Sequence, residues 1–255
     1  MLIAARNAIL AGGAAPGPTP AYWGLCFTAG EAGATVSLKK SGRPDAISLL
    51  YSIDAEHWEP FVAGSTSVTL ANVGDCVWLR AGEGGNATFS KSASSYYYFQ
   101  FPKQVLGSGD IMSLLNGDER IDTVPRFCFY MSFYGCTTLL TAPELSATTL
   151  SGNCYNQMFR NCTSLTETPL LPATTIAARS YFYMFSACSS LASVTTKQTQ
   201  PFGDGSIAND PNYHWMNGVA ATGTFYCPKE LGTNATITRG GSACPEGWTV
   251  VNTDA

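Results

Sequence analysis

The sequence predicts a mainly β protein, with an N-terminal antiparallel β-sandwich followed by a short solenoid of stacked repeats. Residues 21–100 contain short segments of alternating apolar and polar residues with turn residues between them, which is typical of a sandwich. Residues 128–153 recur at a shift of 26 residues, with ten of the 26 positions identical. A repeat of this length indicates units that each bury an apolar face against the next copy.

Residues 1–20 are predicted to be an N-terminal anchor and a Pro/Gly linker, Pro16–Pro20. A secretory signal normally places its positive charge before a long apolar core, but here Arg6 interrupts the apolar run. We therefore expect the anchor to dock on another subunit. Cleavage as a signal peptide is the alternative.

Residues 21–100 are predicted to form the sandwich, and the segment around Trp58 resembles a hairpin of an immunoglobulin-like or fibronectin-like domain. Trp58 is expected at the rim of its core. The predicted strands are Leu25–Thr28, Ala34–Lys39, Ile47–Ile53, Ser65–Leu70, Cys76–Arg80, Ala87–Ser90 and Tyr96–Phe101.

The aromatic run Tyr96–Phe101 marks the junction between the two parts. Successive side chains of a strand point to opposite faces, so both faces of this strand carry aromatic rings. We expect the sandwich to cover one face and the first coil of the repeats to cover the other. A ligand-binding aromatic shelf is the alternative.

The repeat domain is predicted to span residues 101–255, with an atypical cap at each end because terminal repeats face water. Its parts are a cap at 101–127, repeats at 128–153, 154–179 and 180–205, and a C-terminal cap at 206–255. Three columns hold in all three copies and are expected to form the core: Phe133, Phe159, Phe185, Cys136, Cys162, Cys188, Leu139, Leu165 and Leu191.

Seven of the nine cysteines fall into two groups, five at the repeat period and two after it. Those that recur at the repeat period are expected to be reduced, buried thiols that fill space in the core. Zinc is the alternative, but CxxC pairs and clustered histidines are missing. Cys227 and Cys244 lie outside the repeat and flank a polar loop, where a disulfide is possible.

Catalytic chemistry finds little support in the sequence. The two histidines, His57 and His214, are each followed by tryptophan in turn-rich segments, and no G-x-S-x-G, P-loop or dinucleotide motif is present. Asp204 to Asp210 is a calcium-loop alternative to a plain Asx-turn loop. We predict no catalytic residue, cofactor or resident metal.

The repeats resemble a known family. The pattern CYxxMFxxCxSLxxxPxLPATTxA, which starts at Cys154, resembles the leucine-rich repeats of BspA-like surface proteins of gut Bacteroidales and their phages. The resemblance covers roughly residues 105–255, and it implies a right-handed solenoid with one short parallel strand per coil and a role in adhesion. Residues 5–10 are similar to the start of short prophage tail or fibre proteins. Only two repeats match well, so the binding surface would be small.

Positions that vary between the copies are the candidate binding residues, because aromatic and arginine side chains make good contacts. Unconstrained, solvated positions would show the same variation. The candidates are Tyr130, Met131, Tyr134, Asn156, Gln157, Arg160, Phe182, Tyr183, Thr141, Glu144, Glu167 and Leu170.

The expected function is that of a non-enzymatic, extracellular binding protein, preferably a host-attachment protein of a phage virion or tail. The alternatives are a bacterial surface adhesin and, third, a carbohydrate-binding accessory module or glycan-active enzyme. Expected partners are a protein or glycan on a cell surface, other virion subunits through the N-terminus, and further copies of the chain. The net charge of −4 without a basic stripe argues against a nucleic-acid partner. No segment approaches the roughly 20 consecutive apolar residues that a membrane span requires.

Overall fold

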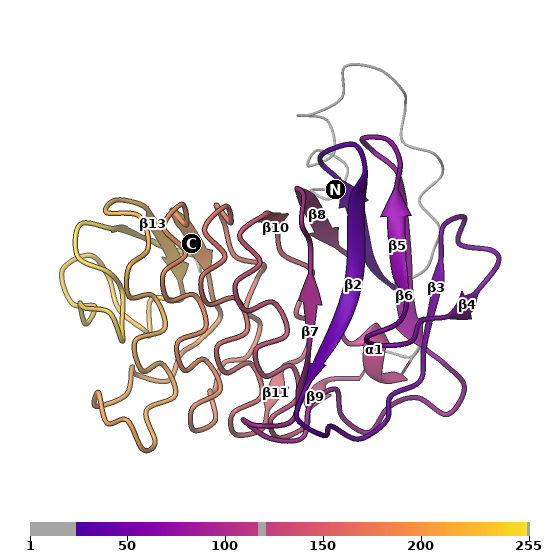
Figure 1. Ribbon diagram of the computed structural model, residues 1–255. Helices are drawn as coiled ribbons and strands as arrows, with labels where there is room; N and C mark the ends of the chain where they lie inside the picture. The colour runs from indigo at the N-terminus through magenta and orange to yellow at the C-terminus, as the bar shows by residue number, and fades with distance from the viewer. Residues whose placement is uncertain (1–23, 117–120, 254–255) are drawn as a thin grey trace.

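The computed structural model describes residues 24–116 and 121–253, and this part of the chain is mainly β with several sheets (Figure 1). Its one helix within those ranges is α1 (Ser113–Asn116). The mainly β prediction is therefore confirmed. The predicted anchor and linker, residues 1–20, lie outside the described residues.

Two sheets face each other in the N-terminal half. Phe27 and Phe99 meet between them with ring centroids 5.1 Å apart. In order, the larger sheet contains β10 (Leu139–Thr141), β8 (Val105–Ser108), β1 (Leu25–Ala29), β6 (Cys76–Ala81), β3 (Leu49–Ser52) and β4 (Glu59–Pro60). The smaller sheet contains β5 (Ser67–Leu70), β2 (Ala34–Ser41) and β7 (Tyr96–Gln100).

The alternation in the sequence produces these strands as expected, with one exception. In β2, Val36 and Leu38 are fully buried, whereas Thr35 and Lys39 on the opposite face are only half-buried. The predicted strand Ala87–Ser90 is wrong, because this segment is a loop that inserts the buried Phe89 into the core. A single apolar residue between polar neighbours resembles strand alternation but also suits a loop with one anchoring side chain.

The larger sheet runs on past residue 100, where the sequence suggested a domain boundary. β8 pairs antiparallel with β1, and β10, which belongs to the first repeat, pairs parallel with β8. One hydrophobic core includes both Phe27 and Phe133. The two predicted domains thus share a sheet and a core, which sequence periodicity alone does not reveal.

The first repeat docks on the edge of β7. The backbone N–H of Phe99 donates to Ser132 O at 2.8 Å, as Phe133 N–H donates to Met158 O at 2.9 Å and Phe159 N–H to Met184 O at 3.0 Å. We call each segment that is hydrogen-bonded to its neighbour in this way a rung. β7 therefore takes the position of a rung before the first repeat, and it lies beside that repeat in Figure 1.

This docking corrects the expectation that both faces of the aromatic run are covered. Tyr97 and Phe99 are buried, but Tyr96 and Tyr98 on the outer face are only half-buried. The reason is that the repeat contacts the edge of β7 through backbone hydrogen bonds and leaves its outer face uncovered.

Aromatic rings stack from rung to rung. The phenylalanine column that starts at Phe99 has centroid distances of 5.1, 5.2 and 5.6 Å and nearly parallel planes. A second column begins at Phe89 and ends at Trp215. All nine residues predicted for the repeat core are buried: Phe133, Phe159, Phe185, Cys136, Cys162, Cys188, Leu139, Leu165 and Leu191.

The cysteine column forms hydrogen bonds between rungs. Cys136 Sγ donates to Phe99 O at 3.3 Å, Cys162 Sγ to Phe133 O at 3.1 Å, and Cys188 Sγ to Phe159 O at 3.0 Å. Burial raises the pKa of the Cys136 and Cys188 thiols to about 12, so these thiols stay protonated at neutral pH.

The structure has nine free cysteines and does not form the expected Cys227–Cys244 bridge. The two side chains have other contacts instead. Cys244 Sγ accepts a hydrogen bond from Arg239 Nη1 at 3.2 Å, and Cys227 Sγ lies 3.8 Å from Gly232 O. Their similar sequence contexts, each followed by proline, did not indicate these separate environments.

Thiol labelling tests this arrangement. Denaturation without reductant should expose all nine cysteines to an alkylating reagent, whereas in the native protein the half-buried Cys76 should react first and the buried Cys162 last. Intact-mass analysis counts the labels. A denatured count of seven, with Cys227 and Cys244 unlabelled, would show that the bridge forms in solution.

The repeat continues beyond residue 205 after an insertion. Met131, Gln157, Tyr183 and His214 all have φ between 48° and 56°, and Ala187 N–H donates to Asn217 O at 2.7 Å. His214 follows Tyr183 by 31 residues rather than 26. The predicted C-terminal cap at 206–255 therefore includes a fourth rung, which the sequence hid because the insertion shifts its register.

Short parallel strands connect successive coils. β12 (Ser193–Thr195), β13 (Thr224–Cys227) and β14 (Thr249–Asn252) form one sheet, and β9 (Thr123–Val124) pairs with β11 (Thr149–Leu150) in another. The two sheets hold different sides of the coils, so the backbone of each coil is bonded to its neighbours at several points.

Candidate functional site

Aromatic and arginine side chains form a continuous stripe across β7 and the turn segments of the repeats. The stripe begins on the outer face of β7, where the Tyr96 ring lies 6.0 Å from Tyr98 and 5.3 Å from Tyr130. We call it the aromatic–arginine stripe; it consists of Tyr96, Tyr98, Tyr130, Gln157, Arg160, Arg179, Phe182, Tyr183, Tyr213 and His214.

The centre of the stripe is a chain of polar contacts. Gln157 Nε2 donates to the Tyr130 hydroxyl at 3.1 Å, and Arg160 Nη1 donates to Gln157 Oε1 at 2.8 Å. The Arg160 guanidinium lies 4.6 Å from the centre of the Tyr183 ring, a cation–π distance. Each residue thus holds the next in place.

The C-terminal part of the stripe is a cluster of rings. Phe182 stacks on Tyr213 at 5.1 Å, and Tyr183 stacks on His214 at 5.6 Å. The Arg179 guanidinium lies 4.3 Å from the centre of the Phe182 ring. The stripe therefore joins β7 to the third and fourth rungs.

The backbone of the rungs places these side chains. Gln157, Tyr183 and His214 have the left-handed conformation that non-glycine residues rarely adopt. Gln157 N–H donates to Phe182 O at 2.8 Å, and Tyr183 N–H donates to Tyr213 O at 2.9 Å. These bonds offset the strain and repeat the same turn, so equivalent side chains emerge in register.

The structure brings together five of the predicted binding residues: Tyr130, Gln157, Arg160, Phe182 and Tyr183. Of these, Tyr130 and Phe182 are buried, as is the candidate Asn156. This corrects the prediction that their column faces solvent, because the left-handed turn directs the next residue outward instead. Tyr130, Asn156 and Phe182 therefore pack beneath the half-buried residues of the stripe.

The remaining candidates lie elsewhere or, within the described residues, form no side-chain hydrogen bond or ring contact with the stripe. Thr141 belongs to β10. Glu144 and Glu167 lie on the strand side of the coils, where their backbones form isolated β-bridges with Asp110 and Ser193, respectively. Leu170 is 44% exposed. Met131 and Tyr134 lie on the turn side and are half-buried.

Sequence reasoning missed several stripe residues. Tyr96 and Tyr98 were indicated only by the shelf alternative for the aromatic run. Arg179 is the last residue of the second repeat, and its equivalents Asn153 and Gly205 gave no sign of a binding column. Tyr213 and His214 lie after the insertion. Their signal was the Tyr-His-Trp-Met segment, which aligns with the third repeat only after a gap of five residues.

The arginines of the stripe have no ion-pair partner among residues 24–116 and 121–253, whereas lysines elsewhere do. Lys91 lies 2.8 Å from Asp45, and Lys103 lies 3.6 Å from Glu31. The buried Nε atoms of Arg160 and Arg179 also lack hydrogen-bond partners within that part of the chain. The stripe thus carries unsatisfied donors and uncompensated positive charge.

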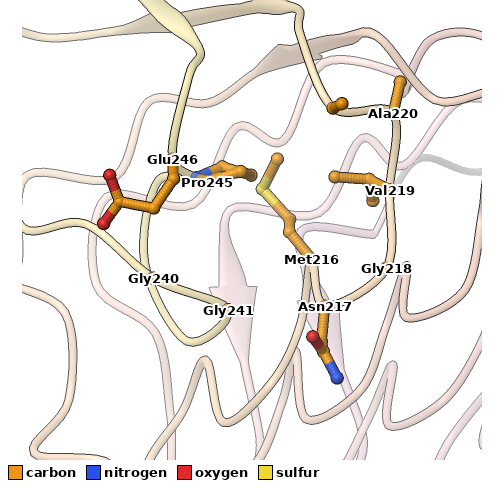
Figure 2. Close-up of a pocket in the computed structure, with 10 residues that line it drawn as sticks. Met216, Asn217, Gly218, Val219, Ala220, Gly240, Gly241, Pro245 and Glu246 are labelled. Atoms are coloured by element: carbon orange, nitrogen blue, oxygen red, sulfur yellow. The ribbon is translucent and has the colours of Figure 1, made fainter.

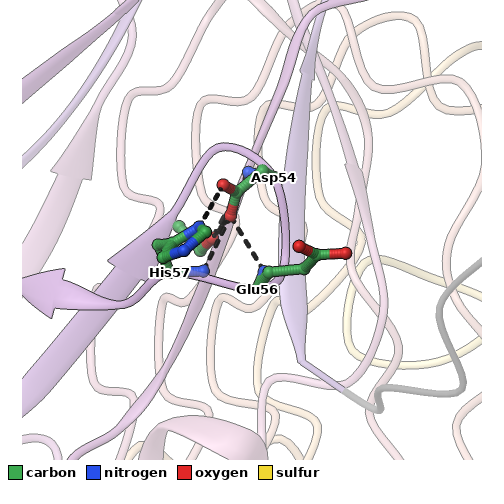
Figure 3. Close-up of polar contacts among 4 residues, drawn as sticks. Asp54, Glu56 and His57 are labelled. Atoms are coloured by element: carbon green, nitrogen blue, oxygen red, sulfur yellow. Dashed lines mark hydrogen bonds and ion pairs between the residues drawn. The ribbon is translucent and has the colours of Figure 1, made fainter.

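His57 belongs to an exposed turn that Asp54 organises (Figure 3). Asp54 Oδ1 accepts the N–H groups of Glu56 and His57 at 2.9 and 2.8 Å, and Oδ2 lies 2.7 Å from His57 Nδ1. The Ser52 hydroxyl donates to Asp54 rather than contacting the histidine. In a serine–histidine–aspartate triad the histidine lies between the other two groups, so the order Ser52–Asp54–His57 is not that of a triad.

The turn should respond to pH in a defined direction. The hydrogen bond to Asp54 and its negative charge raise the pKa of His57, and the backbone N–H of His57 and its ring lower the pKa of Asp54. The histidine contribution is full below about pH 6.5 and is lost as the pH rises through the raised pKa. The aspartate contribution is full above about pH 4 and is lost as the pH falls through the lowered pKa.

Asp54→Asn should therefore return the pKa of His57 towards its ordinary value of about 6.5. An NMR titration of the His57 ring protons measures this. Glu56→Gln, which keeps Asp54 and removes only the weaker effect of the Glu56 charge on this pKa, is the control and should shift the midpoint less. An unchanged midpoint in Asp54→Asn would contradict the contact.

A pocket near the C-terminus is small. It has a volume of about 200 Å³ and is lined by Met216, Asn217, Pro245 and Glu246 with several small residues (Figure 2). Small-molecule sites usually occupy about 300–1,000 Å³. The lining has one carboxylate and no nucleophile, so the pocket offers no paired groups for catalysis.

The loop considered for calcium uses its carboxylates to hold its own backbone. Asp210 accepts the N–H groups of Gly205 at 2.9 Å and Asn212 at 2.8 Å, and Asp204 accepts that of Ser206 at 2.8 Å. This is the Asx-turn arrangement. The described ranges contain no group of three or more His, Cys, Asp or Glu placed to hold a metal ion.

Residues 24–116 and 121–253 contain no helix that is long and apolar enough to cross a membrane. Comparisons with family models, with curated proteins and with solved structures find no match to this chain.

Proposed function

We propose that the chain is a non-enzymatic binding protein displayed outside the cell, and that the aromatic–arginine stripe is its contact surface. In this proposal the two facing sheets are an immunoglobulin-like sandwich and the coils are a short right-handed leucine-rich-repeat solenoid. The observation that carries the proposal is the continuity of the stripe from Tyr98 to Tyr213 with unpaired arginine donors along it.

The residue types favour binding. Tyrosine and arginine are enriched among the residues that contribute most to interfaces, since they bring large contact area and directed hydrogen bonds. Arg160, Arg179, Tyr96 and Tyr183 are all half-buried, so each presents part of its side chain to solvent.

The scaffold favours preorganised contact. The stripe rests on the buried ring columns and on hydrogen bonds between rungs, such as the one from Gln157 N–H to Phe182 O. Because this backbone is fixed before a partner arrives, association requires little ordering of the contact residues.

The setting follows from the resemblance to BspA-like proteins of gut Bacteroidales and their phages. We place the chain on a phage virion or tail, where it attaches the particle to a host cell. The same stripe would serve a bacterial surface adhesin. Purification of virions and of outer-membrane fractions, with detection of the chain in one of them, separates these settings.

Binding to intact cells of gut Bacteroidales isolates tests the function. The labelled full chain should bind saturably, and Arg160→Gln combined with Tyr183→Ala should weaken binding at least about tenfold. Lys197→Gln, an exposed cation outside the stripe, is the matched control and should bind like the parent protein. Thermal unfolding of each variant verifies that the fold is kept.

Two results would overturn the proposal. One is a double variant that binds as tightly as the parent protein on every isolate. The other is release of free sugars from cell-surface material by the purified chain, which would show a glycan-active enzyme.

A further inference from the structure

Building on the proposed function, we infer that the aromatic–arginine stripe binds an acidic polysaccharide, whose sugars stack on the tyrosine rings while their carboxylates or sulfates pair with Arg160 and Arg179. This inference names the ligand class of the proposed surface. It rests on the charge of the stripe, on the arrangement of its rings and on its length.

Charge is the first argument. The chain has a net charge of −4, yet the stripe contains two arginines and no carboxylate. Arg160 uses one Nη for Gln157 and Arg179 lies over Phe182, so both guanidinium groups are held in place. Each Nε is buried, but both side chains are only half-buried, so the remaining Nη donors are open to solvent. A guanidinium presents a planar fork of donors that matches a carboxylate or sulfate. An anionic ligand would satisfy these donors.

The rings supply the second argument. Each arginine is stacked on a ring, Arg160 on Tyr183 and Arg179 on Phe182, and uncharged tyrosines continue the stripe on β7. Pyranose rings have an apolar face of C–H groups that packs on aromatic rings, and hydroxyl groups at the edge that accept and donate hydrogen bonds. The Gln157 amide and the tyrosine hydroxyls lie beside the rings and can form hydrogen bonds with these sugar hydroxyl groups.

The third argument is shape. The stripe crosses successive rungs whose stacked rings are 5.2 and 5.6 Å apart at Phe133, Phe159 and Phe185. One sugar of an extended polysaccharide advances by a comparable length, so neighbouring sugars would meet equivalent positions on neighbouring rungs. An extended polymer fits this surface better than a compact small molecule, which would require a pocket.

The low density of positive charge along the stripe favours a polysaccharide over a nucleic acid as the ligand. Proteins that hold single-stranded nucleic acid also stack bases on aromatic rings, but they follow a backbone with one phosphate per nucleotide through a cationic groove. Here the two arginines are separated by rings and amides, and the whole chain is acidic. Lys39, opposite Tyr98 in the register of β2 and β7, adds one cation at the far end.

Isothermal titration with defined polymers tests the inference on the full chain. The probes are polygalacturonate, which carries carboxylates, and chondroitin sulfate, which also carries sulfates. Each is compared with its neutral counterpart, made from polygalacturonate by carboxyl reduction and from chondroitin sulfate by carboxyl reduction together with desulfation. Polydeoxythymidine and polyglutamate are the probes for nucleic acid and acidic peptide.

At least one acidic polysaccharide should bind at least about tenfold more tightly than its neutral form, and its affinity should fall as sodium chloride is raised. Arg160→Gln with Arg179→Gln should remove this preference, and Tyr183→Ala should weaken acidic and neutral forms together. Lys197→Gln should change neither. In chondroitin sulfate, loss of affinity after desulfation alone identifies the sulfate as the recognised group, and loss after carboxyl reduction alone identifies the carboxylate.

Equal affinity for the neutral polymers would overturn the inference, as would tighter binding of polydeoxythymidine or polyglutamate than of both acidic polysaccharides. Cell binding separates this failure from that of the proposed function. If periodate oxidation of the cell-surface glycans leaves binding unchanged while the stripe variants still abolish it, the polysaccharide inference is wrong and the binding function stands. If neither cells nor polysaccharides bind, both are wrong.

Discussion

Phe159→Ala should lower the free energy of unfolding by about 3–5 kcal/mol, because it removes a fully buried ring from the middle of a stack. Phe133 lies 5.2 Å to one side and Phe185 5.6 Å to the other, with planes within 5° of parallel. The backbone N–H groups of both neighbours donate to the next rung, Phe133 to Met158 and Phe185 to Trp215, and these bonds oppose collapse of the cavity.

Urea unfolding followed by circular dichroism measures this loss. Leu170→Ala in the same repeat is the control, since its side chain is 44% exposed and its loss should cost less than about 1 kcal/mol. The chain has five tryptophans, so single-tryptophan variants that keep only Trp58, in the first half, or only Trp215, in the fourth rung, are compared. Their fluorescence should report one transition, because both halves share a core. Unfolding of Trp215 while Trp58 keeps its native signal would contradict a shared core.

Gly109→Ala should destabilise the protein by about 3 kcal/mol or more, through strain and overlap together. Gly109 follows β8 with φ of 68°, where an L side chain costs about 1 kcal/mol. An added Cβ would overlap the carbonyl oxygen of Gly24, which belongs to the backbone and has no rotamer to change. The carbonyl of Gly109 also accepts the N–H of Glu144 at 2.7 Å, so a shift here would disturb the first repeat.

Gly135→Ala is the matched control, and the chain itself shows that it is tolerated. Gly135 has φ of 72° and nothing within 4 Å of an added Cβ, while Ala187 occupies the equivalent repeat position with φ of 60°. Its cost should stay near 1 kcal/mol. Equal unfolding midpoints for the two alanine variants in urea would show that the close approach to Gly24 is unimportant.

Periodic patterns in the sequence predicted most strands of the two facing sheets and the buried columns of the repeats. Alternation located most strands of the two facing sheets, and the 26-residue period located the buried Phe, Cys and Leu columns. Contacts between distant segments were not predictable in this way. The pairing of β8 with β1 and the docking of Ser132 on Phe99 depend on which edges meet after the core has formed.

The candidate site was partly predictable for the same reason. Variable columns indicated Arg160 and Tyr183, because these positions were aligned by the period. The column that contains Asn156 was wrongly expected at the surface, since the prediction contained no information about the left-handed turn next to it. Tyr213 was missed because five inserted residues separate it from the aligned copies.

The position of β7 as the first rung has a consequence for how such a chain changes length in evolution. Each internal coil meets the same kind of edge on both sides, from the Phe99 edge through the Phe159 edge to the fourth rung. Duplication or loss of one whole 26-residue unit between them would leave both ends with compatible partners. The proposed contact surface would then grow or shrink by one rung at a time, so the number of coils would set the length of the polysaccharide that we propose it binds.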